Sequence, residues 1–268
     1  MPHAVGFIPA RYGSSRFPGK PLATLQGKPL IQHVWERATR ARRLDRVVVA
    51  TDDERIHAAV CSFGGTAMMT SPDHHSGTDR VAEAVRRLED GAEPIEIAVN
   101  IQGDEALLDP EALDGLVDAL DADPALGYAT LAEPFAAAAD ILDPNTCKVV
   151  TDAAGNALYF SRSPIPFLRA PGPGGIEPLP RVLFSRNDGF AGWYRHVGIY
   201  AFRRDALMEF ARMPAGRLEG MEGLEQLRIL EAGRRIRIVV SRHVTMDVDA
   251  PEDLAAVEAL LERQGLRV

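Results

Sequence analysis

The chain has 268 residues, of which 46% are hydrophobic and 25% are charged, a balance typical of an ordinary globular protein with a full core. The formal net charge of −8 argues against nucleic acid or an anionic membrane as a partner, and no apolar run approaches the ~18 residues that a membrane-spanning helix needs. The two cysteines, Cys61 and Cys147, lie far apart, and no basic and apolar leader precedes Ala4, so we expect reduced core thiols in a cytoplasmic protein.

The first half of the sequence alternates strand-like apolar runs with helical patterns. We predict strands over Ala4–Pro9, Arg46–Ala50, Ala67–Met69 and Ile95–Ile101. We predict helices over Leu30–Ala41, Glu54–Phe63, Thr78–Leu88 and Pro110–Leu120. The strands are apolar throughout rather than alternately apolar and polar, which favours a parallel sheet with helices on both of its faces.

The pattern changes after about residue 128. We predict strands over Tyr128–Ala132, Lys148–Thr151, Ala157–Phe160, Arg195–Phe202 and Arg237–Val240. We predict helices over Arg204–Arg212, Glu222–Ala232 and Pro251–Arg263. Proline and glycine are frequent over Pro164–Gly192, which is typical of a lid or of an arm that reaches another subunit. The sequence thus predicts one α/β domain over residues 1–268, with a β-rich section inserted over about 128–203.

The segment after the first strand, Pro9–Lys20, combines glycines with positive charge. It holds Arg11, Arg16 and Lys20, and Lys20 is one of only three lysines in the chain. Ligands of parallel sheets collect at the carboxyl ends of the strands, where backbone N–H groups near Gly13 can hold phosphate oxygens while the cations neutralise them. The segment matches neither the Walker motif nor the dinucleotide glycine motif. We interpret it as a polyphosphate-binding loop, the alternative being a solvated basic loop.

Two acidic segments are candidates for binding a divalent cation. Asp104 follows the strand that ends at Ile101, and Mg²⁺ prefers a few carboxylates together with substrate and water oxygens. The second segment holds Asp247 and Asp249 just before Pro251. Each acid has a structural alternative, because Asp104 could bond its own turn and Asp249 could cap the helix that begins at Pro251.

Other polar residues lie where loops or helix ends are expected, and each alone is more often structural than functional. The candidates are Ser76, Gly77, Thr78 and Arg80 before a helix, then Gln102, Arg162, Arg195, His196, Tyr200, Glu225 and Gln226. His74 and His75 are adjacent, but no cluster of further cysteines or histidines follows, so a zinc site is not predicted.

Taken in order, these motifs resemble one enzyme family, the 3-deoxy-manno-octulosonate (Kdo) cytidylyltransferases, also called CMP-Kdo synthetases. The matching stretches run from residue 8 to residue 254 and read IPARYGSSRFPGKPL, VVVATDDERI, MTSPDHHSGTDR, VNIQGDE, ALYFSRSPIP, RHVGIYAF, LEQLRIL and VDAPEDL. The related CMP-sialic acid synthetases have a similar basic loop but do not carry the set SGTDR, QGDE and RHVGIY. The resemblance implies a three-layer nucleotidyltransferase fold, similar to a Rossmann fold, with a mostly parallel central sheet and an inserted β-rich section used for dimerisation.

The family resemblance also implies a reaction and the residues that perform it. The reaction is CTP + Kdo → CMP-Kdo + pyrophosphate, in a cytoplasmic, Mg²⁺-dependent homodimer that serves lipopolysaccharide or capsule assembly. The catalytic centre would comprise Arg11, Arg16 and Lys20 on the triphosphate, near Ala10 and Gly13, with Asp104 and Asp249 on Mg²⁺. The cytidine would contact Ser76, Gly77, Thr78 and Arg80. The sugar pocket would be formed by Gln102, Arg162, His196, Tyr200, Glu225 and Gln226.

Three departures from the family pattern bear on the substrate. Ala106 replaces the proline that commonly follows QGDE, Asp247 replaces a glycine, and Pro171–Gly192 matches poorly. Another acidic sugar, such as sialic acid or an amino-substituted Kdo, therefore stays open as an alternative. A CTP-binding sensor without turnover would lack the metal carboxylates, and a dinucleotide-dependent oxidoreductase would need the glycine motif that is missing here.

The implied mechanism is an in-line displacement. The anomeric hydroxyl would attack the α-phosphorus of CTP, and the protein would contribute positioning and charge stabilisation. Arginines of the second half would clamp the sugar's carboxylate, since the guanidinium matches a carboxylate in bidentate geometry. No general base stands out in the sequence.

Overall fold

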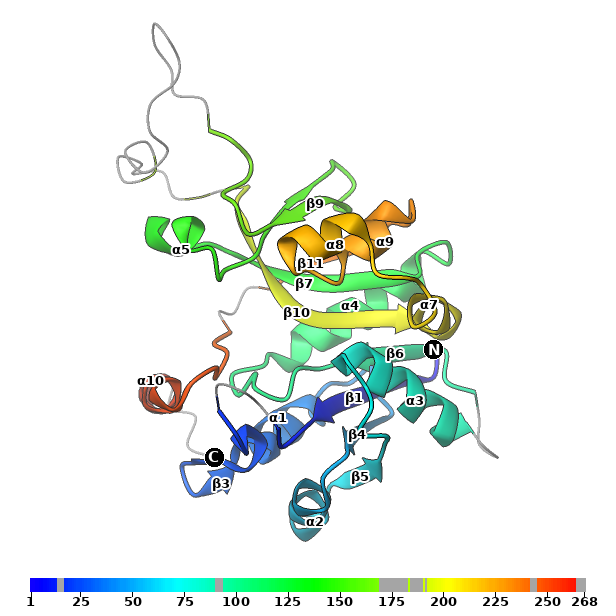
Figure 1. Cartoon of the computed structure of the whole chain (residues 1–268), viewed down its shortest axis with the longest axis vertical. Coiled ribbons are helices and arrows are strands. Elements are labelled where there is room, and N and C mark those ends of the chain that lie inside the picture. The colour runs from blue at the N-terminus through cyan, green and yellow to red at the C-terminus, as the bar shows by residue number, and fades with distance from the viewer. Residues whose placement is uncertain are drawn as a thin grey trace, which may run out of the picture.

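The computed structural model describes residues 1–13, 17–89, 94–168, 183, 190, 192–241 and 245–263. Within them, nine strands form one sheet of order β11-β7-β10-β6-β1-β4-β5, and β8 pairs with both β10 and β9 (Figure 1). The strands are β1 (Ala4–Ala10), β4 (Arg46–Thr51), β5 (Thr66–Met69), β6 (Ile97–Asn100), β7 (Tyr128–Pro134), β8 (Lys148–Thr151), β9 (Ala157–Ser161), β10 (Tyr194–Arg203) and β11 (Ile236–Val240). A separate small hairpin consists of β2 (Thr24–Leu25) and β3 (Lys28–Pro29).

The first-half strands run parallel to one another. β1 pairs with β4 and β6, and β4 pairs with β5, all in the same direction. Their carboxyl ends, among them Ala10, Thr51 and Asn100, therefore lie along one edge of the sheet. β10 runs antiparallel between β6 and β7, whereas β11 is parallel to β7. The predicted α/β class with a mostly parallel central sheet is confirmed.

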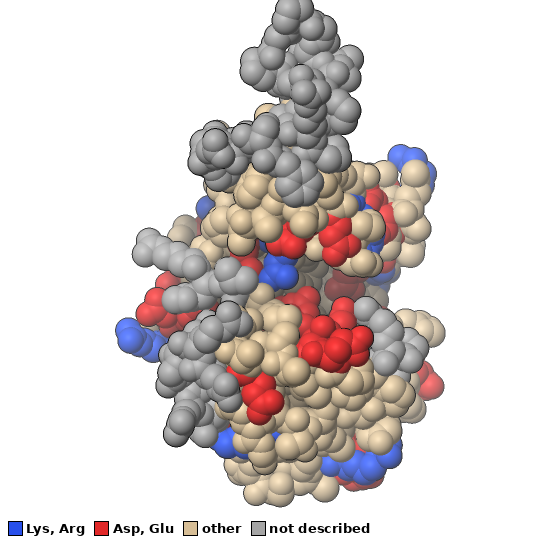
Figure 2. All heavy atoms as spheres, turned by 90° about the vertical axis from the view of Figure 1, so that its left-hand side faces the viewer, with Lys and Arg blue, Asp and Glu red and all other residues tan. Residues whose placement is uncertain are grey.

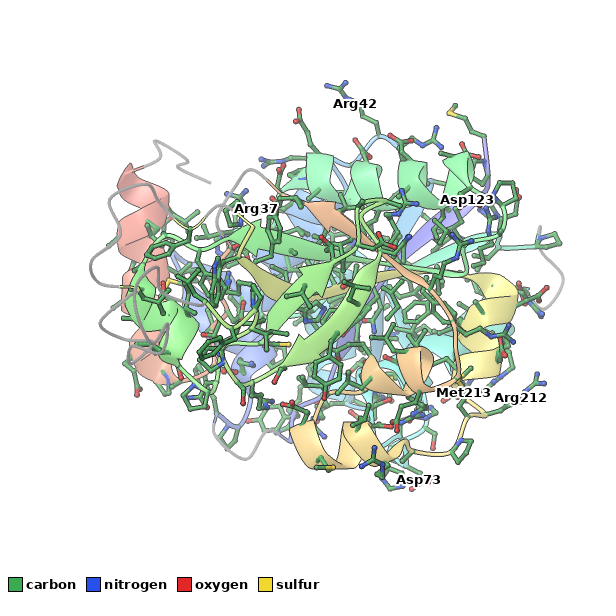
Figure 3. All side chains as sticks on the ribbon, turned by 90° about the horizontal axis from the view of Figure 1, so that it is seen from above. Arg37, Arg42, Asp73, Asp123, Arg212 and Met213 are labelled. Carbon is green, nitrogen blue, oxygen red and sulfur yellow. The ribbon has the colours of Figure 1, made fainter. Side chains whose placement is uncertain are left out.

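Helices cover both faces of this sheet. They are α1 (Leu30–Ala38), α2 (Glu54–Ser62), α3 (Gly77–Glu89), α4 (Pro110–Ala122), α5 (Ala138–Leu142), α7 (Arg204–Phe210), α8 (Arg217–Glu222), α9 (Leu227–Glu231) and α10 (Pro251–Arg263), with one 3₁₀ turn, η1 (Lys20–Leu22). Ile8 and Val49 pack toward α1 and α4, while their neighbours Phe7 and Val48 pack toward α3 and α7. Successive strand residues thus enter two different cores, as expected for a sheet buried on both sides. Figure 3 shows these layers from above, with Arg42 and Asp73 pointing outward on opposite sides.

Several predictions of element boundaries and burial were wrong. The predicted helix Glu222–Ala232 is divided, because Gly223 takes a left-handed conformation (φ 64°) that ends α8 before α9 begins at Leu227. The first predicted helix ends at Ala38 rather than Ala41. Cys61 is exposed instead of lying in the core, because the buried face of α2 is formed by Ile56 and Val60.

The C-terminal segment packs beside the first loop of the chain. A small core joins this segment to the β2–β3 hairpin and contains Leu25, Val248, Val257 and Leu261. In Figure 1, α10 and β3 lie on the same side of the molecule. Most of the predicted excursion Pro164–Gly192 lies outside the described residues. In the part of the chain that the structure covers, every helix is too short or too polar to traverse a bilayer.

Candidate active site

A pocket of about 290 Å³ opens at the carboxyl ends of the parallel strands. It is lined by Pro9, Ala10, Arg11, Lys20, Pro21, His74, His75, Ser76, Gly77, Arg80, Gln102, Gly103, Asp104 and Asp249. This set unites the basic loop, the segment before α3, the loop after β6 and the acidic segment before α10. Figure 2 looks onto this side of the molecule, where acidic and basic side chains meet around a recess. Two described nucleotide-binding candidates, Gly13 and Thr78, do not line the pocket, and Arg16 lies outside the described residues.

The loop after β1 is fixed by backbone geometry that only glycine accommodates easily. Gly19 has a φ of 74°, its N–H donates to Tyr12 O at 2.9 Å, and an added Cβ would meet the Tyr12 ring at 3.1 Å. The Arg55 guanidinium also stacks on the ring of Tyr12, with its Cζ 3.3 Å from the ring centroid. Lys20 follows directly and begins η1, so its side chain is held at the pocket by this turn.

Lys20 lies between the two acids that the sequence proposed as metal ligands. Its Nζ is 2.5 Å from Asp104 Oδ2 and 3.7 Å from Asp249 Oδ1. Burial raises the pKa of Asp104, and the charge of Lys20 opposes that rise. Residues 145 positions apart in the chain thus meet, and the backbone N–H of Val248 donates to Asp104 O at 3.3 Å.

The donor set of this site fits Mg²⁺ better than a transition metal. No group of three or more His, Cys, Asp and Glu side chains in the described ranges is arranged to hold a metal ion. Asp104 and Asp249 supply carboxylate oxygens to the pocket, and Mg²⁺ combines donors of this kind with phosphate and water oxygens, so the residues present fit that ion. The ammonium of Lys20 between Asp104 and Asp249 indicates that the local field favours a cation there.

An ion pair between the partly buried Arg195 and the buried Glu133 contacts the segment that leads to Asp249. Arg195 Nη2 lies 2.9 Å from Glu133 Oε2 and 2.8 Å from Thr245 O, and Glu133 Oε1 accepts from Thr245 N at 2.8 Å. Glu133 is 1% exposed and lies directly opposite Arg195 in the β7–β10 pair. We expected the second-half arginines to clamp the sugar's carboxylate, whereas Arg195 is committed to Thr245, four residues before Asp249.

The first turn of α3 forms one wall of the pocket. Ser76 Oγ accepts from Asp79 N at 3.1 Å, which caps the helix. The Arg80 guanidinium is 2.6 Å from Thr70 Oγ1 and 2.9 Å from Asp52 Oδ2, so it ties the wall to β4 and β5. Thr78 is fully buried and does not line the pocket, although the resemblance assigned it to the cytidine.

Behind the pocket, buried polar side chains gather around β10. The rings of His196 and Tyr200 lie 5.4 Å apart, and Gln226 Nε2 is 3.5 Å from His196 Nδ1. Glu225 precedes Gln226 in the turn between α8 and α9. Burial lowers the pKa of His196 to about 3 and raises the pKa of Tyr200 well above its usual range, so both side chains are neutral. The second ring nitrogen of His196, Nε2, lies 3.0 Å from Thr130 Oγ1, so both of its nitrogens have partners within the protein and neither ring carries a charge.

Arg162 lies at the edge of this cluster and is fixed through its backbone and its Nε. Arg162 Nε donates to Glu222 O at 2.8 Å, and its backbone N–H donates to Glu222 Oε2 at 2.9 Å. The Arg162 carbonyl accepts from the fully buried Lys148 Nζ at 2.7 Å. Lys148 also donates to the carbonyls of Asp143 and Thr146. Lys148 therefore joins the loop between α5 and β8 to the chain that follows β9.

The structure brings most of the sequence candidates together and adds residues that the sequence did not indicate. Ala10, Arg11, Lys20, Ser76, Gly77, Arg80, Gln102, Asp104 and Asp249 share one pocket, and His196, Tyr200, Glu225 and Gln226 lie together beside β10. Glu133 and Thr245 were missed, since Glu133 is a lone polar residue in an apolar strand and Thr245 lies in a loop that no motif singles out.

Comparison with known proteins places this arrangement in a family. The cytidylyltransferase family model matches residues 5–236. The 3-deoxy-manno-octulosonate cytidylyltransferase of Syntrophobacter fumaroxidans is 51% identical, with 98% of each chain covered, and that of Geobacter sulfurreducens is 50% identical, with 93% of this chain and 96% of the relative covered.

Solved structures agree with the sequence relatives. A CMP:2-keto-3-deoxy-manno-octonic acid synthetase complexed with CTP superposes with a TM-score of 0.84 at 44% identity, covering 98% of this chain and 99% of that one. A cytidylyltransferase from Leptospira borgpetersenii, at 16% identity and a TM-score of 0.60, shares the fold. The chain belongs to the 3-deoxy-manno-octulosonate cytidylyltransferase family.

Proposed function

We propose that this protein transfers the cytidylyl group of CTP to the anomeric hydroxyl of Kdo and releases pyrophosphate. The observation that carries the proposal is the meeting of Lys20, Asp104 and Asp249 in one pocket at the carboxyl ends of the parallel strands. A cytoplasmic enzyme that supplies CMP-Kdo for lipopolysaccharide or capsule assembly is the role that we infer from the family.

In the proposed reaction the hydroxyl oxygen of the sugar bonds to the α-phosphorus while the bond to the pyrophosphate oxygen breaks. The hydroxyl proton passes to solvent. Arg11 and Lys20 neutralise the phosphate oxygens, a role that Arg16 would share, and the amides around Ser76 and Gly77 face the nucleotide. Asp104 and Asp249 would hold Mg²⁺, which when bound stabilises negative charge on the α-phosphate.

The sugar is proposed to bind beside β10. Neutral Tyr200, with Gln226 and Gln102, provides hydrogen bonds for hydroxyl groups, and His196, whose ring nitrogens bond to Thr130 and Gln226, holds the shape of this pocket. Among the described residues, the Arg162 side chain donates to backbone carbonyls only, so its positive charge suits the sugar's carboxylate.

The direct experiment is pyrophosphate release from CTP and Mg²⁺ with a panel of acidic sugars. We expect turnover with Kdo and much slower turnover with sialic acid or an amino-substituted Kdo. Faster turnover with either of those two sugars would identify that sugar, rather than Kdo, as the substrate. CTP binding without pyrophosphate release with any sugar would favour a sensor.

We also propose that the chain forms a homodimer through the β-rich section over about 128–203. Leu158 on β9 is 61% exposed and Phe167 is 65% exposed, next to a largely apolar groove that Tyr159, Ile165 and Tyr194 help to line. Sedimentation analysis of Leu158→Asp should reveal monomers, and a wild-type chain that sediments as a monomer would contradict the proposal.

A further inference from the structure

Thr78 physically joins the nucleotide wall to the proposed sugar cluster. It lies in the first turn of α3, between Gly77 and Arg80, both of which line the pocket. Its own side chain points away from the pocket: it is fully buried, and its Oγ1 donates to Glu225 Oε1 at 2.8 Å. These two residues are 147 positions apart, so the bond links separate parts of the chain.

The hydroxyl of Thr78 is committed on both its donor and its acceptor side. A hydroxyl has one hydrogen, which faces Glu225, and its oxygen accepts from Asn100 Nδ2 at 3.3 Å. Asn100 is the last residue of β6 and is 1% exposed. The Thr78 hydroxyl therefore has little freedom to rotate, and it fixes one oxygen of Glu225 in a defined direction.

The wall that carries Thr78 is held by hydrogen bonds at its beginning and after Thr78. Arg80, two residues later, is anchored to Thr70 and Asp52, and Ser76 caps the turn. Glu225 by contrast lies in the short turn between α8 and α9. A nucleotide that contacts Ser76 and Gly77 would therefore contact the same helical turn whose Thr78 hydroxyl bonds to Glu225.

We propose that Thr78 is a positioning residue that couples nucleotide binding to sugar binding by orienting Glu225. This inference rests on the proposed function, in which Glu225 belongs to the sugar pocket. It reassigns Thr78 from the cytidine to the sugar side of the reaction. Thr78 itself contacts neither substrate.

The test compares Thr78→Val, which keeps the shape and removes the hydroxyl, with Thr78→Ser, which keeps the hydroxyl. Thr78→Val should raise the KM for Kdo roughly tenfold, because Glu225 and Asn100 both lose a partner, and should change the KM for CTP by less than about twofold. Thr78→Ser should behave as the wild type. Thr78→Ala removes the same hydroxyl and provides the measurement if the valine variant does not fold.

A binding experiment measures the coupling itself. Calorimetry gives the Kd for Kdo with and without a non-hydrolysable CTP analogue. The ratio of the Kd without the analogue to the Kd with it should exceed about fivefold in the wild type and in Thr78→Ser, and it should approach one in Thr78→Val. In a Glu225→Ala background, which removes the acceptor of the Thr78 hydroxyl, Thr78→Val should add little further loss, since both changes disrupt one interaction.

Two outcomes would overturn the inference. A rise in the KM for CTP rather than Kdo in Thr78→Val would make Thr78 a nucleotide ligand, and an unchanged coupling ratio would make the bond to Glu225 structural only. Failure of the wild type to release pyrophosphate from CTP and Kdo would instead count against the proposed function, so the two failures are distinguishable.

Discussion

Replacing Lys148 by methionine should destabilise the fold more than most single substitutions. The Lys148 ammonium is fully buried and donates to the carbonyls of Asp143, Thr146 and Arg162 at 2.6, 2.7 and 2.7 Å. Methionine has nearly the same length and no donor, so the three carbonyls lose their partner while the packing volume is kept.

The magnitude follows from the three hydrogen bonds and the cost of burying the charge. A hydrogen bond to a charged group contributes about 1.5–3 kcal/mol net, but three bonds to one ammonium are not additive. Burial lowers the pKa of Lys148, so desolvation offsets part of the gain. We therefore expect a loss of about 3–5 kcal/mol in the free energy of unfolding, a large share of the total of about 5–15 kcal/mol.

Urea unfolding followed by circular dichroism measures this loss, and Lys28→Met is the matched control. Lys28 pairs with Glu36 at 2.9 Å while its side chain is 30% exposed, so its removal should cost less than about 1 kcal/mol. If Lys148→Met costs no more than Lys28→Met at an unchanged urea dependence, the assignment of Lys148 as a structural bridge is wrong.

Three further predictions concern the site. Asp104→Asn should keep the fold and lower kcat on the order of 10²-fold, and near-normal kcat at saturating Mg²⁺ would refute its role. The pKa of His196 is lowered to about 3, so folded His196 stays neutral where an unfolded His takes up a proton near pH 6.5. The free energy of unfolding should therefore fall on acidification between these values, by up to about 1.4 kcal/mol per pH unit. A His196→Gln variant with the same pH dependence of unfolding would contradict this. Glu133→Gln should weaken Mn²⁺ binding, measured by electron paramagnetic resonance with a CTP analogue present, by about tenfold through loss of the Arg195 pair, whereas Glu209→Gln at an exposed pair should have no effect.

The sequence was sufficient to predict the part of the site that depends on local pattern. Apolar strands followed by polar loops identify carboxyl ends, and parallel pairing brings such ends together, so Lys20 and Asp104 could be expected to meet. The position of Asp249 had a weaker basis, because an acid before Pro251 is equally compatible with a helix cap. The family resemblance, rather than spacing, joined it to Asp104.

Partners that depend on tertiary packing could not be predicted. Thr78 meets Glu225 across 147 positions, and Thr245 meets Glu133 across 112 positions, without any periodicity that would relate them. The break between α8 and α9 was missed for a different reason: Gly223 interrupts an otherwise helical pattern, and a single glycine is tolerated in many helices.

The placement of β10 limits how this gene can vary. Side chains alternate along a strand, so Arg195 faces the acidic segment while its neighbour His196 faces Tyr200. Deleting one codon between His196 and Tyr200 would put Tyr200 on the opposite face of the strand from His196 and so separate the two rings. Insertions and deletions should therefore be absent from the middle of β10, even among distant members that differ freely elsewhere.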